Sequence, residues 1–252
     1  MTTSGGTRTS SYVWPRFSRL TRSLRRGIES LVALLFPPEC VLCGSSLPEL
    51  GLLCESCEGE LAMLGGDRCI VCGEPIDGPS LDLCIPCGTR ERGFDRLIAL
   101  GSYEGGWGAL VRALKFEREK AAGRWLASRL AATAVREGIC ADVVTFVPMT
   151  ADERRRRGLN QARVLARSVS KLLRLPMRRT LRKVRRTAPQ SGLSARARRD
   201  NLRGAFRALP SKGARVVLID DICTTGSTAE ACAAALRQAG ALSVDVLVVA
   251  RA

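Results

Sequence analysis

Histidine is absent from this chain of 252 residues, so no general base, nucleophile partner or metal ligand in it is an imidazole. Long apolar runs are absent as well. The longest, such as Leu31–Phe36, fall far short of the about 18 residues that a membrane-spanning helix needs. That run also lacks a small-residue cleavage pattern, which argues against a secretory signal. These absences predict a cytoplasmic protein without a membrane span.

Acidic residues are scarce in one part of the chain. Residues 151–207 hold 19 Lys and Arg against three acids, a net charge of +16 that equals the net charge of the whole chain. A basic block of this size favours a polyanionic ligand such as phosphates, pyrophosphate or nucleic acid, with a solvated arginine-rich surface as the alternative. Aromatic residues make up only 4% of the chain, so the block favours contact with phosphates over stacking on bases.

Cysteine is abundant before residue 88. Eight of the eleven cysteines form four Cys-x-x-Cys pairs, separated in turn by ten, eleven and eleven residues. Such pairs in a protein that is not secreted favour metal over disulfides, and four thiolates form a tetrahedral ligand set for Zn²⁺. We therefore expect two structural zinc ions in a double zinc ribbon, paired sequentially, although spacing alone leaves another pairing open. The predicted ligands are Cys40, Cys43, Cys54, Cys57, Cys69, Cys72, Cys84 and Cys87.

Three cysteines lie outside this array. Cys140 and Cys232 are expected to pack in the core or on a helix, as free cysteines usually do. Cys223 lies beside a small-residue loop, where either packing or a reactive thiol is conceivable.

Predicted strands and helices alternate after residue 93. Apolar runs predict strands, and helical spacing predicts helices between them. Residues 176–204 are too basic and irregular to contribute to a core. The alternation predicts a parallel α/β sheet flanked by helices. The strands are expected over Arg96–Gly101, Asp142–Pro148, Arg215–Ile219 and Ser243–Val249, and the helices over Trp107–Phe116, Ala121–Arg136, Gln161–Leu173 and Ser227–Gln238.

Three regions follow from these patterns. We expect a basic tail or helix over residues 1–36, with an amphipathic stretch at Phe17–Leu35, a double zinc ribbon over residues 37–92, and the α/β domain over residues 93–252. The double proline after Phe36 ends the first region.

The segment Val216–Thr228 gives the clearest indication of a ligand-binding site. Four apolar residues, two acids and a run of small residues lead into an alanine-rich helix, and ligands of open α/β sheets bind at the carboxyl ends of strands. Backbone N–H groups and the dipole at the start of the helix suit a phosphate, and Asp220 and Asp221 suit sugar hydroxyls, directly or through a metal. Ordinary helix capping is the alternative. The predicted phosphate contacts are Thr224, Thr225, Gly226, Ser227 and Thr228.

This segment resembles the phosphoribosyl pyrophosphate (PRPP) motif of type I phosphoribosyltransferases. Further segments narrow the resemblance to the ComF family, competence-associated proteins with an N-terminal zinc module. They are Val147-Pro148 with Arg157-Gly-Leu-Asn-Gln161, Gln190-Ser-Gly-Leu193 with Arg199-Asp-Asn201, Gly204-Ala-Phe206, and the cysteine array before Phe94-Asp95. The resemblance covers roughly residues 36–252.

The resemblance implies a type I phosphoribosyltransferase fold in which Asp220 and Asp221 contact the ribose and Thr224–Thr228 hold the 5-phosphate. The loop after Pro148 would bind pyrophosphate, with Arg157 as its cation. Residues 182–193 would form a hood that closes over the site and excludes water. Magnesium would accompany PRPP. Thr224 stands where purine-salvage members carry an Asp base, so 6-oxopurine salvage is not expected.

Three functions remain open at this stage. The first is a phosphoribosyltransferase with an unidentified acceptor. The second is a competence factor that binds single-stranded DNA and acts with other DNA-uptake proteins, which the excess of cations favours. The third is a PRPP-sensing regulator without chemistry.

Overall fold

The structure is a computed structural model that describes residues 38–48, 51–61, 64, 67–76, 82–115, 119–185, 187 and 195–252. The expected basic helix over Phe17–Leu35 and most of the expected hood lie outside the described residues. Within the described part of the chain, no helix combines the length and apolar character that crossing a bilayer requires.

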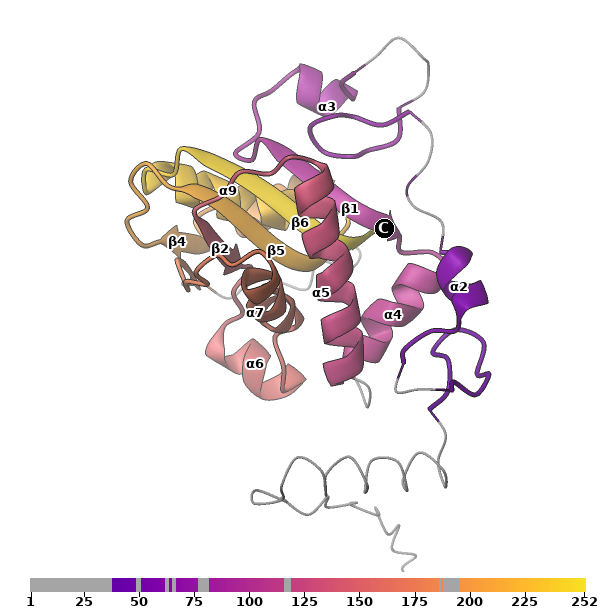
Figure 1. The fold of residues 1–252 in the computed structure, drawn as a ribbon. Coiled ribbons are helices and arrows are strands. Elements are labelled where there is room, and N and C mark those ends of the chain that lie inside the picture. The colour runs from indigo at the N-terminus through magenta and orange to yellow at the C-terminus, as the bar shows by residue number, and fades with distance from the viewer. Residues whose placement is uncertain are drawn as a thin grey trace, which may run out of the picture.

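A parallel sheet of four strands forms the centre of the molecule (Figure 1). Its order is β1 (Arg96–Ser102), β6 (Ser243–Arg251), β5 (Arg215–Cys223) and β2 (Val143–Phe146), and every neighbouring pair is parallel. The strands are rich in Val, Ile and Leu because both faces of the sheet are covered. The predicted parallel α/β sheet is confirmed.

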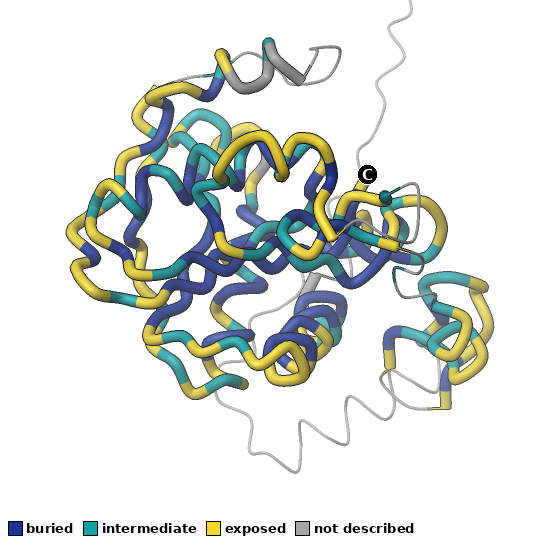
Figure 2. Tube along the Cα trace, turned by 90° about the horizontal axis from the view of Figure 1, so that it is seen from above, coloured by how far each residue is buried: buried dark blue, intermediate teal, exposed yellow. Residues whose placement is uncertain are grey.

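Side chains alternate between two cores along each strand. On one face, Val217 and Ile219 of β5 pack beneath α4 (Gly106–Lys115), α5 (Glu119–Arg136) and α7 (Gln161–Leu172). On the other face, Val216 and Leu218 pack against α9 (Ser227–Gln238). Figure 2 shows the buried positions running through the centre of these layers. The sheet is thus held rigidly from both sides, which fixes the loops at its carboxyl edge.

The basic segment that follows α7 contributes to the core, contrary to expectation. Residues Leu181–Lys183 form β3, which pairs antiparallel with β4 (Phe206–Ala208), and α8 spans Ala195–Leu202. The side chains of Leu181 and Leu202 are almost fully buried against α9. The many arginines around these two leucines hid both core positions from the sequence pattern, and the described arginines Arg182, Arg185 and Arg203 are exposed.

A further helix, α6 (Ala151–Arg157), follows β2 where only a loop was expected. Thr150 caps the N–H of Glu153, and the carboxylate of Glu153 accepts the N–H of Thr150 at 2.8 Å. This reciprocal capping box starts the helix and was present in the sequence as Thr-x-x-Glu.

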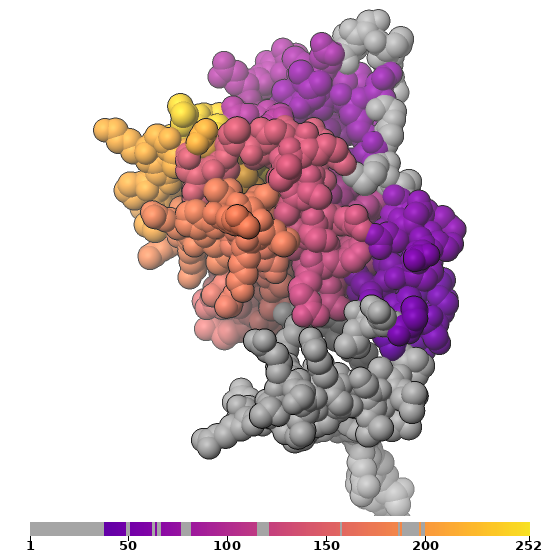
Figure 3. Space-filling view, in the orientation of Figure 1, coloured from indigo at the N-terminus to yellow at the C-terminus, as the bar shows by residue number. Residues whose placement is uncertain are grey.

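The two zinc ribbons have the same local backbone structure. Gly44 and Gly73 adopt positive φ of 76° and 67°, which lets their N–H groups turn back to the carbonyls of Cys40 and Cys69. In each ribbon a short helix starts directly after the first cysteine of the second pair and contains the second cysteine of that pair. These helices are α2 (Glu55–Gly59) and α3 (Ile85–Gly88). The first ribbon lies beside α4 and α5 in Figure 3, where Arg129 of α5 pairs with Glu58.

Candidate functional site

The two residues predicted to contact the ribose, Asp220 and Asp221, lie inside β5 rather than after it. The strand was expected to end at Ile219, but its pairing with β6 continues through Cys223. The carboxylates of Asp220 and Asp221 are half-buried and accept the N–H groups of the following residues, at 2.9 and 3.0 Å. The sheet therefore holds the backbone of both acids at its carboxyl edge.

The two carboxylates leave opposite faces of the strand. Asp220 continues the row of Leu218, which packs against α9, and Asp221 continues the row of Ile219, which packs beneath α5 and α7. The negative charge of Asp220 also helps to raise the pKa of buried Cys232 in α9, after the larger effect of burial. The acids thus flank the end of β5 from both sides.

The predicted phosphate loop, Thr224–Thr228, follows β5 directly in the chain. Gly226 has a φ of 72°, in the left-handed region, and serves as the N-cap of α9. A glycine cap has no side chain to occupy the first-turn N–H groups of the helix, which carry the positive end of its dipole. The N-cap of α9 therefore makes no side-chain hydrogen bond to the first turn of the helix. The Oγ atoms of Thr225 and Ser227 lie 2.8 Å apart, while Thr224 is exposed.

The end of β2 meets the end of β5 at the same edge. The N–H of Val147 donates to the carbonyl of Ile219 at 3.0 Å, and Pro148 is buried immediately beyond. Only Met149 and Thr150 separate Pro148 from α6. Arg157 is the last residue of that helix, and its side chain lies outside the described part of the structure. The roles of Pro148 and Arg157 toward pyrophosphate stay predictions.

The three lone cysteines differ in environment. Cys232 is fully buried, as expected, but Cys140 is exposed, so its predicted packing is wrong. Burial, helped by the charge of Asp220, raises the pKa of Cys223 to about 12. A buried thiol that stays protonated is a poor nucleophile, so Cys223 packs rather than reacts.

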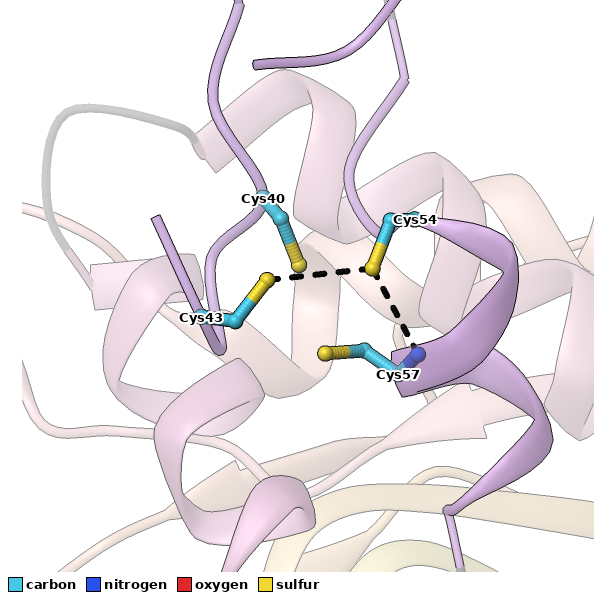
Figure 4. Close-up of side chains that lie close together, drawn as sticks. All are labelled: Cys40, Cys43, Cys54 and Cys57. Atoms are coloured by element: carbon cyan, nitrogen blue, oxygen red, sulfur yellow. Dashed lines mark hydrogen bonds between the residues drawn. The ribbon is translucent and has the colours of Figure 1, made fainter. Parts of the chain in front are cut away.

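The cysteine pairs assemble sequentially. Figure 4 shows the four side chains of the first quartet pointing toward one centre. In each quartet all four Sγ atoms lie within 4.8 Å of one another, which is the arrangement that one tetrahedral ion requires. The alternative pairing left open by the spacing is excluded. The quartets are Cys40, Cys43, Cys54 and Cys57, and Cys69, Cys72, Cys84 and Cys87.

The thiols of the first quartet fit a cation. Burial opposes ionisation of Cys40, but backbone hydrogen bonds at Cys43 and Cys54 outweigh it and lower its pKa to about 6. The neighbouring thiols Cys54 and Cys43 raise the pKa of Cys57. The pKa values of neighbouring thiols move apart in this way because four thiolates this close repel one another unless a positive ion lies between them. Zn²⁺ supplies that charge and closes the ribbon.

The second ribbon is joined to the candidate site through Arg251, the last residue of β6. One guanidinium nitrogen of this buried side chain donates to the carbonyl of Cys72 at 2.7 Å and lies 3.6 Å from the Sγ of Cys223. The same guanidinium pairs with Glu74. The sequence offers no local indication of this contact, because Arg251 and Cys72 are 179 positions apart in the chain.

We expect Arg251→Leu to loosen the second ribbon selectively. The change leaves the Cys72 carbonyl without its donor, and a lost hydrogen bond to a charged group costs about 1.5–3 kcal/mol. A chromogenic chelator should then remove one of the two zinc ions on the order of tenfold faster. Arg129→Leu, which removes the exposed pair with Glu58 on the first ribbon, is the control and should change release little. Equal release from the parent and Arg251→Leu would contradict this role.

The fold and the site together define a phosphoribosyltransferase domain joined to a double zinc ribbon. Family models for a double zinc ribbon domain and a phosphoribosyl transferase domain match residues 31–89 and 158–252. Competence protein F of Haemophilus influenzae is 31% identical over 224 residues, covering 79% of this chain and 96% of that protein. DNA utilization protein YhgH of Salmonella typhi is 35% identical over 189 residues, covering 71% and 81%. The chain belongs to the ComF family.

A solved structure is similar over part of the chain. Glutamine PRPP amidotransferase from B. subtilis, complexed with ADP and GMP, is 26% identical, with a TM-score of 0.36. The match covers 50% of this chain and 25% of that protein, too little to bear on function.

Proposed function

We propose that this chain binds PRPP with Mg²⁺ at the carboxyl edge of its sheet. One observation carries the proposal: two half-buried carboxylates at the end of β5 directly precede a glycine-capped helix whose first N–H groups face the loop. Thr224–Thr228 would hold the 5-phosphate, and Asp220 and Asp221 would orient the ribose hydroxyls. Phosphate and diol sites at this spacing suit a ribose 5-phosphate group.

The remaining parts of the site follow from this placement. Pro148 and Arg157 would hold the pyrophosphate, and residues 182–193 would cover the reacting carbon. Carboxylate oxygens are the ligands that Mg²⁺ prefers, so Asp220 and Asp221 fit the ion; when bound, it would neutralise charge on the pyrophosphate. We assign this role to residues 93–252, with residues 37–92 as the ribbon module and residues 1–36 as a basic tail, in a cytoplasmic protein.

Calorimetric titration tests the proposal. PRPP with Mg²⁺ should bind the parent protein, while the double variant Asp220→Asn with Asp221→Asn should show no heat of binding. A screen for pyrophosphate release with candidate acceptors then separates a transferase from a PRPP-sensing regulator. Absence of PRPP binding by the parent would reject all of these roles.

Single-stranded DNA is a second candidate ligand, in keeping with the names of the relatives. Exposed arginines extend over α6, α7 and the segment before β3, and in the described part of the chain no acid lies within ion-pair distance of Arg156, Arg167, Arg174, Arg178 or Arg182. Exposed cations without counter-charges are the usual basis of binding to a nucleic-acid backbone. Other DNA-uptake proteins would be the further partners of such a complex.

We expect binding of single-stranded DNA to depend steeply on salt. Each phosphate contact releases counterions, so affinity should fall by at least about tenfold when salt rises from about 50 to about 200 mM. Fluorescence anisotropy of a labelled oligothymidylate measures this directly. Because aromatic residues are few, adding purines should change affinity little. Binding that is insensitive to salt, or undetectable, would remove DNA as a ligand.

A further inference from the structure

A buried arginine joins a ligand of the second zinc ion to α9. Arg92 lies between the second ribbon and β1, and only 7% of its side chain is exposed. Its Nε donates to the Sγ of Cys87 at 3.2 Å, and its Nη1 lies 3.7 Å from Oε2 of Glu230 in α9. Its Cζ lies 5.8 Å from the centroid of the Phe94 ring. One side chain therefore contacts both a zinc ligand and the helix that follows the phosphate loop.

The carboxylate of Glu230 depends on this arginine. Its Oε1 accepts the N–H of Gly93 at 3.0 Å, but its Oε2 is buried, and no described donor forms a hydrogen bond with it. Among the described residues, Arg92 is the cation within ion-pair distance of this carboxylate. A buried carboxylate that loses its counter-charge is strongly destabilised. The first turn of α9 is thus held in place by Arg92.

The backbone beside Arg92 is fixed against α9 as well. A Cβ atom on Gly93 would lie 2.7 Å from the backbone N of Ala234, so this position has no room for a side chain. The carbonyl of Gly93 also accepts a hydrogen bond from Nε of Arg237 at 3.3 Å. The segment that leads from the second ribbon into β1 is therefore attached directly to α9.

The second ribbon contacts residues on both sides of the predicted phosphate loop. Glu230 lies one turn after Gly226, and its N–H donates to the carbonyl of that N-cap residue at 2.8 Å. On the other side, Arg251 connects Cys223, the residue directly before the loop, to the carbonyl of Cys72. Two buried arginines thus link the second zinc quartet to both ends of the loop.

We propose that the second zinc ion and PRPP stabilise each other's binding, and that Arg92 is the positioning residue that transmits this effect. The inference rests on the proposed PRPP site and assigns a regulation to it. As a zinc ligand, Cys87 is a thiolate held in one place, and a charged acceptor of this kind orients the guanidinium of Arg92. The oriented guanidinium then holds Glu230 and the loop. Because coupling between two sites is reciprocal, bound PRPP should also retain the ion.

The first ribbon provides an internal control. Its leucines Leu42, Leu52 and Leu53 pack on the other core, beside α4 and α5, and Glu58 pairs with Arg129 of α5. In the described part of the chain, no arginine donates a hydrogen bond to any of its four cysteines. PRPP should therefore leave the first zinc ion unaffected.

Zinc release measures the coupling in the parent protein. A chromogenic chelator removes zinc with or without PRPP and Mg²⁺, N-ethylmaleimide alkylates the freed thiols, and peptide mass spectrometry assigns them to one quartet. PRPP should slow release from the second quartet by at least about fivefold, the low end of typical coupling, and leave the first unchanged. The variant Asp220→Asn with Asp221→Asn controls for effects of PRPP in solution and should show no slowing.

A double variant tests the role of Arg92. Arg92→Met with Glu230→Gln removes both charges together, so neither is left buried without its partner, and glutamine keeps the Oε1 that accepts the N–H of Gly93. This variant should bind two zinc ions, but saturating PRPP should no longer slow release from the second quartet. Arg237→Met is the matched control, because Arg237 joins the same segment to α9 through the carbonyl of Gly93, and it should keep the slowing.

Two results would overturn the proposal. The first is calorimetric binding of PRPP to the parent protein without slower release from the second quartet, or with equal slowing at both quartets. The second is undiminished slowing in the double variant. Glu230→Gln alone, which leaves Arg92 its thiolate partner, replaces a double variant that does not fold. Absence of PRPP binding by the parent is a separate result, because it refutes the proposed function and the coupling with it.

Discussion

PRPP with Mg²⁺ should raise the melting temperature of the parent protein by several degrees and leave that of Asp220→Asn with Asp221→Asn unchanged. A ligand present at about one hundred times its Kd stabilises the folded state by about 2.7 kcal/mol. For a chain of this size each kcal/mol shifts the midpoint by roughly 2–4 °C, so a shift of roughly 5–10 °C is expected. Differential scanning fluorimetry with and without PRPP measures it.

The two substitutions remove the negative charges but keep the local hydrogen bonds of the fold. Asparagine keeps the Oδ1 atom that accepts the N–H of the next residue, so the local hydrogen bonds at Asp220 and Asp221 survive. What disappears is the negative charge that would orient the ribose hydroxyls and Mg²⁺. Asp142→Asn is the control, because this exposed acid pairs with Arg215 at the amino end of β5 and should keep the full shift. A parent protein that PRPP does not stabilise would refute the proposed site.

The candidate phosphate loop could be predicted from the sequence because all its parts are contiguous. The apolar run of β5, the two acids, Gly226 and the start of α9 fall within thirteen residues, and α9 has the predicted bounds. The strand was predicted four residues too short, because polar residues at its end were interpreted as loop. Pairing of Asp220 with Val248 extends the strand, and that pairing depends on β6, which lies further along the chain.

Features that depend on distant contacts could not be predicted. The antiparallel pair of β3 and β4 joins Leu181 to Ala208, and the basic segment between the two strands has no regular pattern. The contact of Arg251 with the second ribbon, and the pair of Arg92 with Glu230, arise only when separate elements meet. Leu172 has the helical spacing of the buried residues of α7, yet 54% of it is exposed, because it lies at the end of the helix.

The zinc quartets could be predicted because cysteine spacing encodes the metal site directly, but the difference between the two ribbons could not. The second quartet is embedded in a core cluster with Phe94 and Leu97 of the α/β domain, and three of its four cysteines are buried. In the first quartet only Cys40 is buried, and Cys43 is exposed. The second zinc should therefore support the stability of the whole protein, and the first mainly that of its own ribbon.

We accordingly expect Cys72→Ser to destabilise the protein far more than Cys43→Ser. Both changes should lower the zinc content from two ions to one, and structural zinc in small domains contributes about 10–16 kcal/mol of apparent binding free energy. Loss of the ion at Cys72 also removes the anchor of Arg251 and exposes the core beside Phe94, so the melting temperature of the α/β domain should fall. Loss at Cys43 should leave that temperature nearly unchanged.

Metal analysis and thermal melting of the same samples test this difference. Cys140→Ser is the matched control, because Cys140 is exposed and lies in neither quartet, and it should keep two zinc ions and the parent melting temperature. A parent protein without zinc would refute the ribbon assignment itself. Equal melting temperatures for Cys72→Ser and Cys43→Ser, with one zinc lost in each, would instead show that the second ribbon folds independently of the sheet. In that case the contact of Arg251 with the Cys72 carbonyl would contribute nothing to the stability of the α/β domain. The binding free energy of the second zinc would then stabilise only the ribbon that holds it.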